Sequence, residues 1–175
     1  MKPRDFELQP TLTGARLVLR PLRAEDFEPL YAAASDPLIW EVHPERQRHE
    51  RPVFERFFAD GLKTGAAFAV IERATGRIVG TSRYYDLDAE KSEVAVGFTF
   101  LVRRLWGGSF NRELKTLMLE HAFRFVKTVL FHVGESNVRS RKAMEKIGGV
   151  LSGERTKTGS DGLPRRDVIY RIVRP

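Results

Sequence analysis

The sequence predicts a mixed α/β (α+β) fold in which one central sheet is flanked by helices. Two observations predict it. Short runs of alternating or β-branched apolar residues share the chain with longer segments whose apolar residues recur at spacings of three and four, in the order β-α-α-β-β-β-α-β-α-β-β. These segments amount to about seven strands and about four helices. The 175 residues contain no internal repeat and no linker rich in Gly, Ser or Pro, so we expect a single domain over residues 1–175.

The chain begins with a short strand and a helix. Residues 16–20 alternate between polar and apolar side chains, and Pro21 ends this strand. The segment 24–34 predicts a helix, because two acidic residues in its first turn suit the positive end of a helix dipole. Pro37 ends the helix, since the residue before a proline avoids helical torsion angles.

A second helix, a hairpin and a longer strand follow. Apolar side chains recur at helical spacing between Pro52 and Lys63. The segments 67–71 and 77–80 flank a turn that ends in glycine, which is typical of a β-hairpin. The segment 92–101 predicts a strand. Four of its apolar side chains are expected on one side: Val94, Val96, Phe98 and Phe100.

The second half of the chain alternates helices and strands. An apolar stripe predicts a helix over 110–126, and the apolar run 128–133 predicts a buried strand. The segment 137–147 predicts a helix that Gly148-Gly149 ends. Two strands complete the sheet: 150–155 and 167–173.

Composition excludes several classes of protein. The absence of cysteine excludes disulfide scaffolds, thiolate metal sites, iron–sulfur clusters and cysteine nucleophiles. The longest run without a charged residue is nine residues, 94–102, far below the ~18 that a membrane span needs. No apolar segment of the signal-peptide type follows the first charges. We therefore expect a cytoplasmic protein without a membrane partner.

Charge is distributed unevenly along the chain. Residues 1–100 carry 14 basic and 16 acidic side chains, whereas residues 101–175 carry 16 basic and 7 acidic ones. A basic half implies an anionic partner, such as a nucleic acid, an acidic protein or a phosphate-rich small molecule. A basic surface that serves only solubility would have the same composition.

The stretch from Thr99 to Asn111 has the features of an anion site. An apolar strand ends, two arginines and Gly107-Gly108 follow, and an amphipathic helix begins. Free amides at a helix N-terminus attract anions, and glycines let a ligand approach the backbone. The stretch has neither the Walker nor the Rossmann signature. An ordinary turn capped by Ser109 would also have these residues.

These residues resemble the acetyl-CoA site of the GNAT superfamily of N-acetyltransferases. The family motif Arg/Gln-x-x-Gly-x-Gly/Ala is matched by 104–109, with Ser109 in place of the last small residue. A second family motif, on a later helix, is matched by four residues: Asn137, Ser140, Lys146 and Gly148. The chain departs from this motif at Met144, where many relatives have tyrosine, and at Gly149, where they have phenylalanine.

The opening segment 13–21, followed by Asp26, resembles the ribosomal-protein (Rim-type) N-terminal acetyltransferase branch of the family. The resemblance covers residues from about 11 to 173 and implies a mostly antiparallel central sheet. It also implies transfer of an acetyl group from acetyl-CoA to a primary amine by direct attack in a ternary complex. The acceptor would be a small molecule, an amino acid or a protein N-terminus, and a homodimer would be common among relatives.

The resemblance implies roles for individual residues. Acetyl-CoA would be bound by the edge of the strand, the loop and the later helix, through these residues: Phe100, Val102, Arg104, Leu105, Trp106, Gly107, Gly108, Ser109, Phe110, Asn111, Asn137 and Ser140. Glu93 would act as the general base, directly or through water. Ser140 would donate to the leaving thiolate in place of the tyrosine, and Trp40 and Tyr84 would line the acceptor site.

Other interpretations remain open for these residues and for the chain. Glu93 also fits a solvated surface position, and Trp40 fits a packing role. His121 is expected in the core, and no pattern of ligands completes a metal site, so no metal is expected. The chain as a whole also fits a basic RNA- or ribosome-associated protein, or a catalytically inactive acyl-CoA-binding module.

Overall fold

The computed structural model describes residues 2–159 and 161–175, which form one eight-stranded sheet and four α-helices. The strands are β1 (Leu12–Thr13), β2 (Leu17–Pro21), β3 (Ala67–Glu72), β4 (Ile78–Asp88), β5 (Glu93–Leu101), β6 (Thr128–Gly134), β7 (Val150–Thr158) and β8 (Pro164–Val173). The helices are α1 (Phe27–Ala34), α2 (Arg51–Thr64), α3 (Phe110–Ala122) and α4 (Val138–Lys146). The mixed, mostly antiparallel fold is confirmed, with one strand more than predicted because the two-residue β1 pairs with β2.

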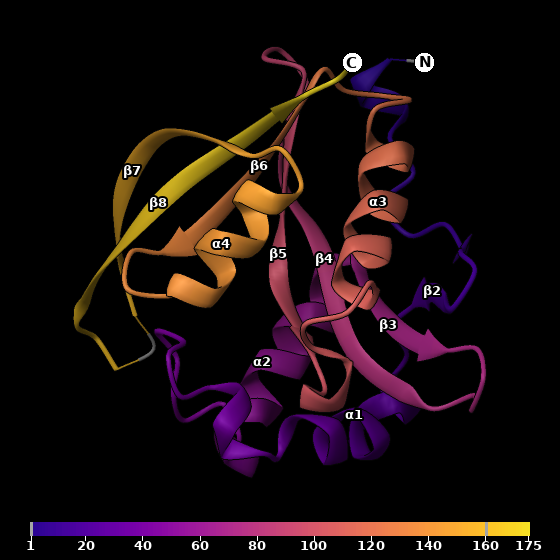
Figure 1. The fold of residues 1–175 in the computed structure, drawn as a ribbon, viewed down its shortest axis with the longest axis vertical. Helices are drawn as coiled ribbons and strands as arrows, with labels where there is room; N and C mark the ends of the chain where they lie inside the picture. The colour runs from indigo at the N-terminus through magenta and orange to yellow at the C-terminus, as the bar shows by residue number, and fades with distance from the viewer. Residues whose placement is uncertain (1, 160) are drawn as a thin grey trace.

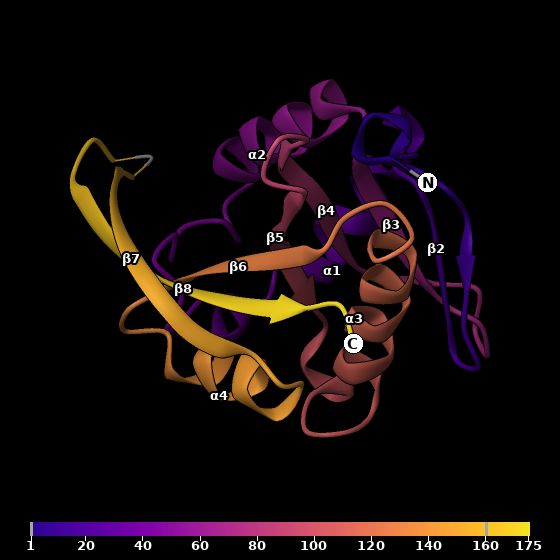
Figure 2. The same ribbon diagram turned by 90° about the horizontal axis from the view of Figure 1, so that it is seen from above.

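The strands lie in the order β1-β2-β3-β4-β5-β6-β8-β7. Helices α3 and α4 cover one face of the sheet, and α1 and α2 cover the other (Figures 1 and 2). Each face has its own core. The α3 side buries residues such as Phe68, Val96 and Met118, and the α2 side buries residues such as Leu30 and Phe54.

Several predicted elements have different boundaries in the structure. β7 and β8 each extend three residues further towards the turn between them than predicted. α1 begins at Phe27, because Ala24–Asp26 forms a separate 3-10 turn held by the ion pair of Asp26 with Arg20. α3 ends at Ala122, four residues before its predicted end. β4 continues to Asp88, well past the predicted 77–80, because it pairs with β5 along this extension.

A β-bulge in β5 corrects the predicted alternation of its side chains. Thr81 pairs with Phe100 and Arg83 pairs with Gly97, so two residues of β5 oppose one residue of β4. Phe98, inside the bulge, has a positive φ of 53°. Val94 and Val96 of β5 face α3, whereas the two phenylalanines, Phe98 and Phe100, face α2.

β5 and β6 are parallel neighbours that separate after a short ladder. Glu93, Val94 and Ala95 of β5 pair with Thr128, Val129 and Leu130 of β6. Beyond these pairs β6 continues beside β8 and β5 beside β4, so the two strands diverge towards α1 and α2 (Figure 1). We call the diverging segments, 96–101 of β5 and 131–134 of β6, the fork.

A carboxylate of α3 binds the backbone at the start of β2. Glu113 accepts hydrogen bonds from the backbone amides of Arg16 at 3.0 Å and Leu17 at 2.7 Å. The residues are nearly one hundred positions apart in the chain, so no local sequence pattern indicates the contact.

Replacing this carboxylate should destabilise the protein. Glu113→Ala leaves both amides without their acceptor, and we expect the free energy of unfolding to fall by about 1–3 kcal/mol. Urea denaturation measures it. Glu113→Gln keeps one acceptor oxygen and should lose less. Equal stability of the wild type and the alanine variant would contradict this role.

Candidate active site

The loop after β5 leads directly into the N-terminus of α3. A 3-10 turn, Arg103–Leu105, follows β5, and Gly107 then adopts a φ of 74°, a left-handed conformation that favours glycine. Ser109 occupies the N-cap position without capping the helix, because its hydroxyl oxygen accepts a hydrogen bond from the Arg16 guanidinium. The first amides of α3 therefore keep no acceptor within the helix.

The two glycines leave the backbone of this loop bare. A Cβ atom at Gly107 or Gly108 would meet no atom within 4 Å. Since an oxyanion needs open approach to N–H groups, this part of the loop fits the predicted phosphate contact. The contact does not extend to Leu105 and Trp106, whose amides already donate to the carbonyls of Val102 and Arg103. The expectation for these two amides is corrected accordingly.

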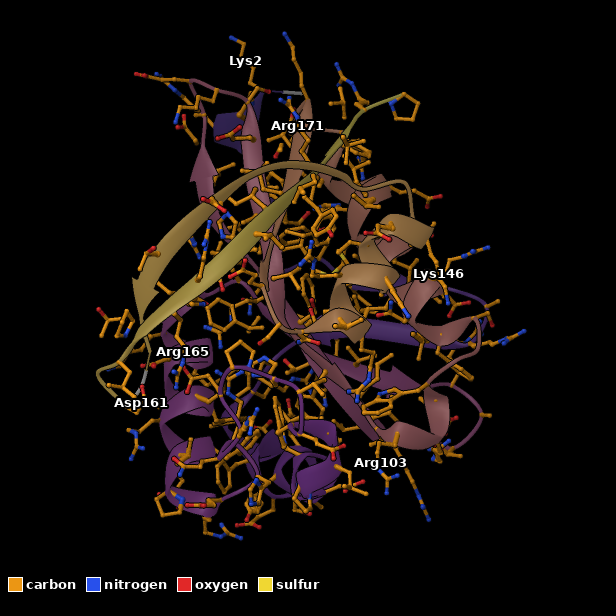
Figure 3. All side chains as sticks on the ribbon, turned by 60° about the vertical axis from the view of Figure 1, so that its left-hand side comes forward. Lys2, Arg103, Lys146, Asp161, Arg165 and Arg171 are labelled. Atoms are coloured by element: carbon orange, nitrogen blue, oxygen red, sulfur yellow. The ribbon has the colours of Figure 1, made fainter. Side chains whose placement is uncertain are left out.

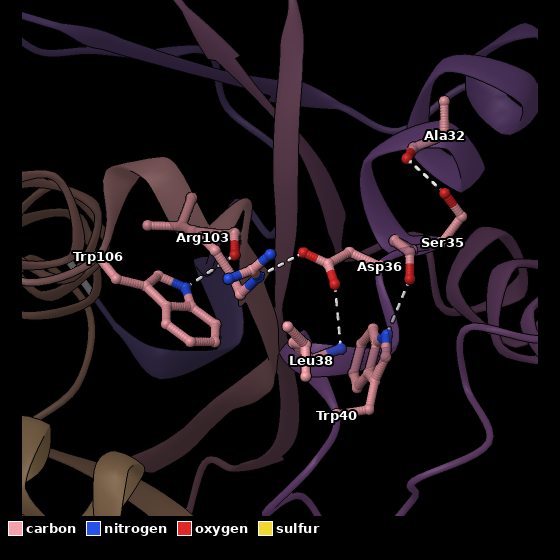
Figure 4. Close-up of polar contacts among 9 residues, drawn as sticks. Ala32, Ser35, Asp36, Leu38, Trp40, Arg103 and Trp106 are labelled. Atoms are coloured by element: carbon pink, nitrogen blue, oxygen red, sulfur yellow. Dashed lines mark hydrogen bonds and ion pairs between the residues drawn. The ribbon is translucent and has the colours of Figure 1, made fainter.

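Both arginines of the loop already have carboxylate partners. Arg104 forms a bidentate pair with Glu72 of β3, at 2.8 and 2.9 Å, and this holds the pKa of Glu72 at about 2. Arg103 pairs with Asp36, which precedes the turn Pro37–Ile39 (Figure 4). These pairs anchor the loop to its neighbours, and a phosphate contact by Arg104, whose side chain is 53% exposed, stays a prediction.

A different arginine approaches the loop from α4. Trp106 donates from its indole nitrogen to the carbonyl of Leu101 at 2.9 Å (Figure 4), and the Arg139 guanidinium lies 3.8 Å from the centroid of the Trp106 ring. This contact brings a cation from the first turn of α4 onto the loop. Sequence reasoning selected Trp106 and missed Arg139, because a stacking contact between distant segments has no fixed spacing.

The backbone of β5 offers hydrogen-bonding groups to the fork. The Val102 amide donates to the Val79 carbonyl, and the Val102 carbonyl accepts a hydrogen bond from the Leu105 amide. Phe100 points its carbonyl at Gly80 of β4. Since alternate residues of a strand direct their backbone groups to opposite neighbours, Thr99 and Leu101 face the fork instead. The backbone contacts with acetyl-CoA that were predicted for Phe100 and Val102 are therefore reassigned to their neighbours Thr99 and Leu101.

On the other side of the fork, Asn137 caps α4. Its side-chain oxygen accepts a hydrogen bond from the Ser140 amide at 3.2 Å, so Asn137 is the N-cap of the helix. The Ser140 side chain is half-buried on the first turn of the helix, and Met144 is buried in the core under α3 and α4.

Glu93 lies at the opposite end of β5 from the loop. It pairs with Thr128 in the closed part of the ladder. Gly97, where the strands have parted, is four residues further, or about 13 Å along an extended strand. The structure therefore does not bring Glu93 together with the other predicted site residues.

The two predicted acceptor-site residues are part of the cores. Tyr84 is completely buried, and its hydroxyl donates to the Met118 carbonyl at 2.6 Å. Trp40 is also buried, and its indole nitrogen donates to the Ala34 carbonyl at 2.8 Å (Figure 4). Neither side chain offers a surface to a substrate, so both expectations are corrected.

The neighbours of Tyr84 point to the α2 side of the fork instead. Arg83 pairs with Gly97 and Tyr85 with Ala95. The Tyr85 hydroxyl of β4 lies 3.0 Å from Nδ1 of His132 on β6, so this contact passes over β5 where the fork begins. Burial lowers the pKa of His132 to about 4, which leaves its ring neutral at pH 7. The sequence did not indicate which face His132 occupies.

A groove of about 590 Å³ opens at the end of β6. It lies between the segment 42–47, the residues 134–136 at and after the end of β6, and the tip of the β7–β8 hairpin. Asp161 and Arg165 lie together at this tip (Figure 3). His43, which lines the groove, packs edge-on against the Trp40 ring at a centroid distance of 5.3 Å.

One lysine is buried on the α3 side of the fork. Lys115 is 4% exposed, and its amine donates to the Thr99 hydroxyl at 3.1 Å. The amine also lies 5.4 Å from the centroid of the Phe131 ring on β6. Within residues 2–159 and 161–175 it has no carboxylate partner. Burial lowers its pKa to about 8.

The sequence matches the family model of the acetyltransferase (GNAT) domain over residues 16–150. The chain belongs to the GNAT family. The diverging central strands and the loop before α3 lie within the matched region, and the segment 13–21 overlaps its start. GNAT membership indicates acetyl transfer from acetyl-CoA.

Several solved GNAT structures share this fold. The GCN5-related N-acetyltransferase from Brucella melitensis aligns with 99% of this chain and 82% of its own, at 19% identity and a TM-score of 0.83. A putative ribosomal-protein-serine acetyltransferase from Vibrio cholerae covers 99% of this chain and 100% of its own, at 18% identity and a TM-score of 0.76. Mycobacterium smegmatis RimJ, solved in complex with CoA-disulfide, covers 99% of this chain and 90% of its own, at 18% identity and a TM-score of 0.71. No curated protein matches the sequence.

Two further properties concern the part of the GNAT chain that the structure describes. None of its helices has the length and apolar character needed to cross a membrane. It also contains no group of three or more His, Cys, Asp or Glu residues arranged to hold a metal ion.

Proposed function

We propose that this protein transfers the acetyl group of acetyl-CoA to a primary amine within a ternary complex. The observation that carries the proposal is the combination of the fork with the bare loop at the N-terminus of α3. The two faces of the fork suit two ligands. The α3 and α4 face suits acetyl-CoA, and the α2 face, with its groove, suits the amine.

The residues of the α3 and α4 face fit acetyl-CoA. The amides of 107–111 would bind the pyrophosphate, with Arg139 supplying positive charge from α4. The Thr99 backbone and the Leu101 amide would hydrogen-bond the pantetheine arm as an added strand does, because the Leu101 carbonyl already accepts the Trp106 indole N–H. Asn137 and Ser140 on α4 would border the same arm. Bound acetyl-CoA supplies an acyl group activated as a thioester.

The amine must lose a proton before it can attack. An α-amine titrates near 7.7–8.0 and a lysine amine near 10.4, so an α-amine needs less help from a base. His132 lies at the fork, and in the tautomer whose Nδ1–H donates to Tyr85 we propose Nε2 as the acceptor of that proton. The lowered pKa of about 4 makes His132 a weak base, which suits an α-amine better than a lysine amine. Glu93, the base predicted from the resemblance, lies in the closed ladder.

The leaving thiolate needs little help. A thiol ionises near pH 8.5, so it leaves readily at neutral pH. Ser140 remains the predicted donor to this sulfur, and Ser140→Ala should change the rate only slightly.

A pair of variants separates the two bases. We expect His132→Asn to lower kcat/KM by about 10²-fold, because a positioned general base contributes about 10²–10⁴-fold. We expect Glu93→Gln to leave it nearly unchanged. Acetyl-CoA affinity, measured by calorimetry, should be the same in both variants. A large loss of kcat/KM in Glu93→Gln, with no loss in His132→Asn, would identify Glu93 as the base.

Thiol release from acetyl-CoA in the presence of a panel of amines tests the proposed function itself. The panel should include amino acids, peptides with free N-termini, polyamines and aminoglycosides. Amine-dependent release by at least one class is the expected result. Acetyl-CoA binding without release for any amine would instead indicate an inactive acyl-CoA-binding module.

A further inference from the structure

Arg83 is a buried cation without an ion pair among the described residues, although the negative charge of Asp60 on α2 acts on it and opposes the effect of burial on its pKa. Its residue is 5% exposed, and its one side-chain hydrogen bond is a long one of 3.4 Å to the Phe57 carbonyl. By contrast, the half-buried Arg20 has a paired carboxylate, Asp26. Burial lowers the pKa of Arg83 to about 10, so it keeps its charge at neutral pH.

Aromatic rings hold the Arg83 guanidinium in place. It lies 4.0 Å from the centroid of Phe98 and 5.2 Å from that of Phe57. Phe98 is itself 38% exposed, although it is a large apolar side chain in the middle of a strand. Stacking fixes the plane of a guanidinium while its edge stays available to an acceptor.

Arg83 lies at the point where the fork opens. It pairs with Gly97, two residues beyond Ala95, the last residue of β5 that pairs with β6. On the same face, Tyr85 packs against Phe98 at a centroid distance of 5.1 Å and contacts His132 of β6. A group bound to Arg83 would therefore lie close to an amine held at His132.

A second arginine approaches the same ring. The Arg48 guanidinium lies 4.3 Å from the centroid of Phe57 and 5.4 Å from that of Trp40. Burial lowers the pKa of Arg48 to about 10, and the charge of Arg83 contributes to this shift while Glu45 opposes it. Two like charges gathered in a largely buried site are stabilised by an anion that joins them.

We propose that Arg83, supported by Arg48, binds a carboxylate of the amine acceptor. The acceptor class is then an amine that carries a carboxylate a few atoms away. This inference rests on the proposed acetyl transfer. The planar guanidinium matches a carboxylate with two parallel hydrogen bonds. An acceptor without the carboxylate leaves Arg83 buried and unpaired, which selects against it.

Two pairs of acceptors test the proposal and distinguish two sources of the carboxylate. Alanine and alaninamide differ in the α-carboxylate. The blocked peptides Asp-Ala-Ala-amide and Asn-Ala-Ala-amide differ in a side-chain carboxylate. We expect kcat/KM for the acidic member of one pair to be at least about 10²-fold higher. Equal rates within both pairs would overturn the proposal.

Variants and direct binding complete the test. Arg83→Met should abolish the preference for the acidic acceptor while leaving the acetyl-CoA dissociation constant unchanged. Arg83→Lys keeps the positive charge at this position and should retain part of the preference. Arg77→Met is the matched control, because Arg77 is exposed and immediately precedes β4. It should behave as the wild type.

Calorimetric titration of N-acetylalanine and N-acetylalaninamide into the protein saturated with CoA gives a readout that does not depend on turnover. Tighter binding of N-acetylalanine by the wild type, lost in Arg83→Met, supports an α-carboxylate site, and the corresponding N-acetylated peptides test a side-chain carboxylate. Equal binding within both pairs overturns the site. Failure to bind acetyl-CoA would instead overturn the proposed function.

Discussion

Lys115→Met is expected to stabilise the protein by about 3 kcal/mol at pH 7. The amine of Lys115 is buried in the fork with one hydroxyl partner, the Thr99 side chain. Its pKa in the folded protein is about 8, below the ordinary value of 10.5. Each unit of such a shift corresponds to about 1.4 kcal/mol between the two protonation states. Methionine fills a similar volume without a charge.

The pH dependence of this gain follows from the same shift. Between pH 8 and pH 10.5 the unfolded chain binds more protons at Lys115 than the folded one, so the wild type becomes more stable as the pH rises through this window. The advantage of Lys115→Met should be complete below pH 8 and should shrink towards pH 10.5. Urea denaturation at pH 7 and pH 10 measures both values. A methionine variant less stable than the wild type at pH 7 would contradict this account.

Gly108→Leu is expected to weaken acetyl-CoA binding by at least about 10²-fold, which corresponds to 2.7 kcal/mol or more. Gly108 does not have a positive φ, and an added Cβ meets nothing within 4 Å. The fold should therefore accept a leucine there, with a change in stability of less than about 0.5 kcal/mol. The new side chain would cover the amides that we propose for the pyrophosphate.

Gly153→Leu is the matched control for this substitution. Gly153 lies on the exposed strand β7, also without a positive φ, and a Cβ there meets only Ile169 at 4.0 Å. Calorimetry should give the wild-type dissociation constant for the control. Undiminished affinity in Gly108→Leu would show that the ligand binds elsewhere.

The sequence predicts the order of elements and the position of the anion loop because these depend on local patterns. Apolar periodicity marks α2 and α3 over most of their lengths, and the glycines before α3 mark the loop. These features need only neighbouring residues, so they can be read without knowing how distant segments meet.

The face of the sheet that each side chain of the fork occupies could not be predicted in the same way. One extra residue in a strand moves every later side chain to the other face, and the bulge at Phe98 does this to Phe100. The roles of Arg104 and Arg139 depend on partners about thirty residues away along the chain, Glu72 and Trp106. Such partners leave no local pattern.

Amide NMR spectra recorded during titration with acetyl-CoA test the central claim most directly. The claim is that residues 107–111 and the fork edge of β5 bind acetyl-CoA. We predict that the largest shifts of backbone amide resonances occur at these residues, with smaller shifts at Asn137 and Ser140 on α4. A spectrum that does not change, or changes confined to the outer strands β1 and β7, would contradict the claim.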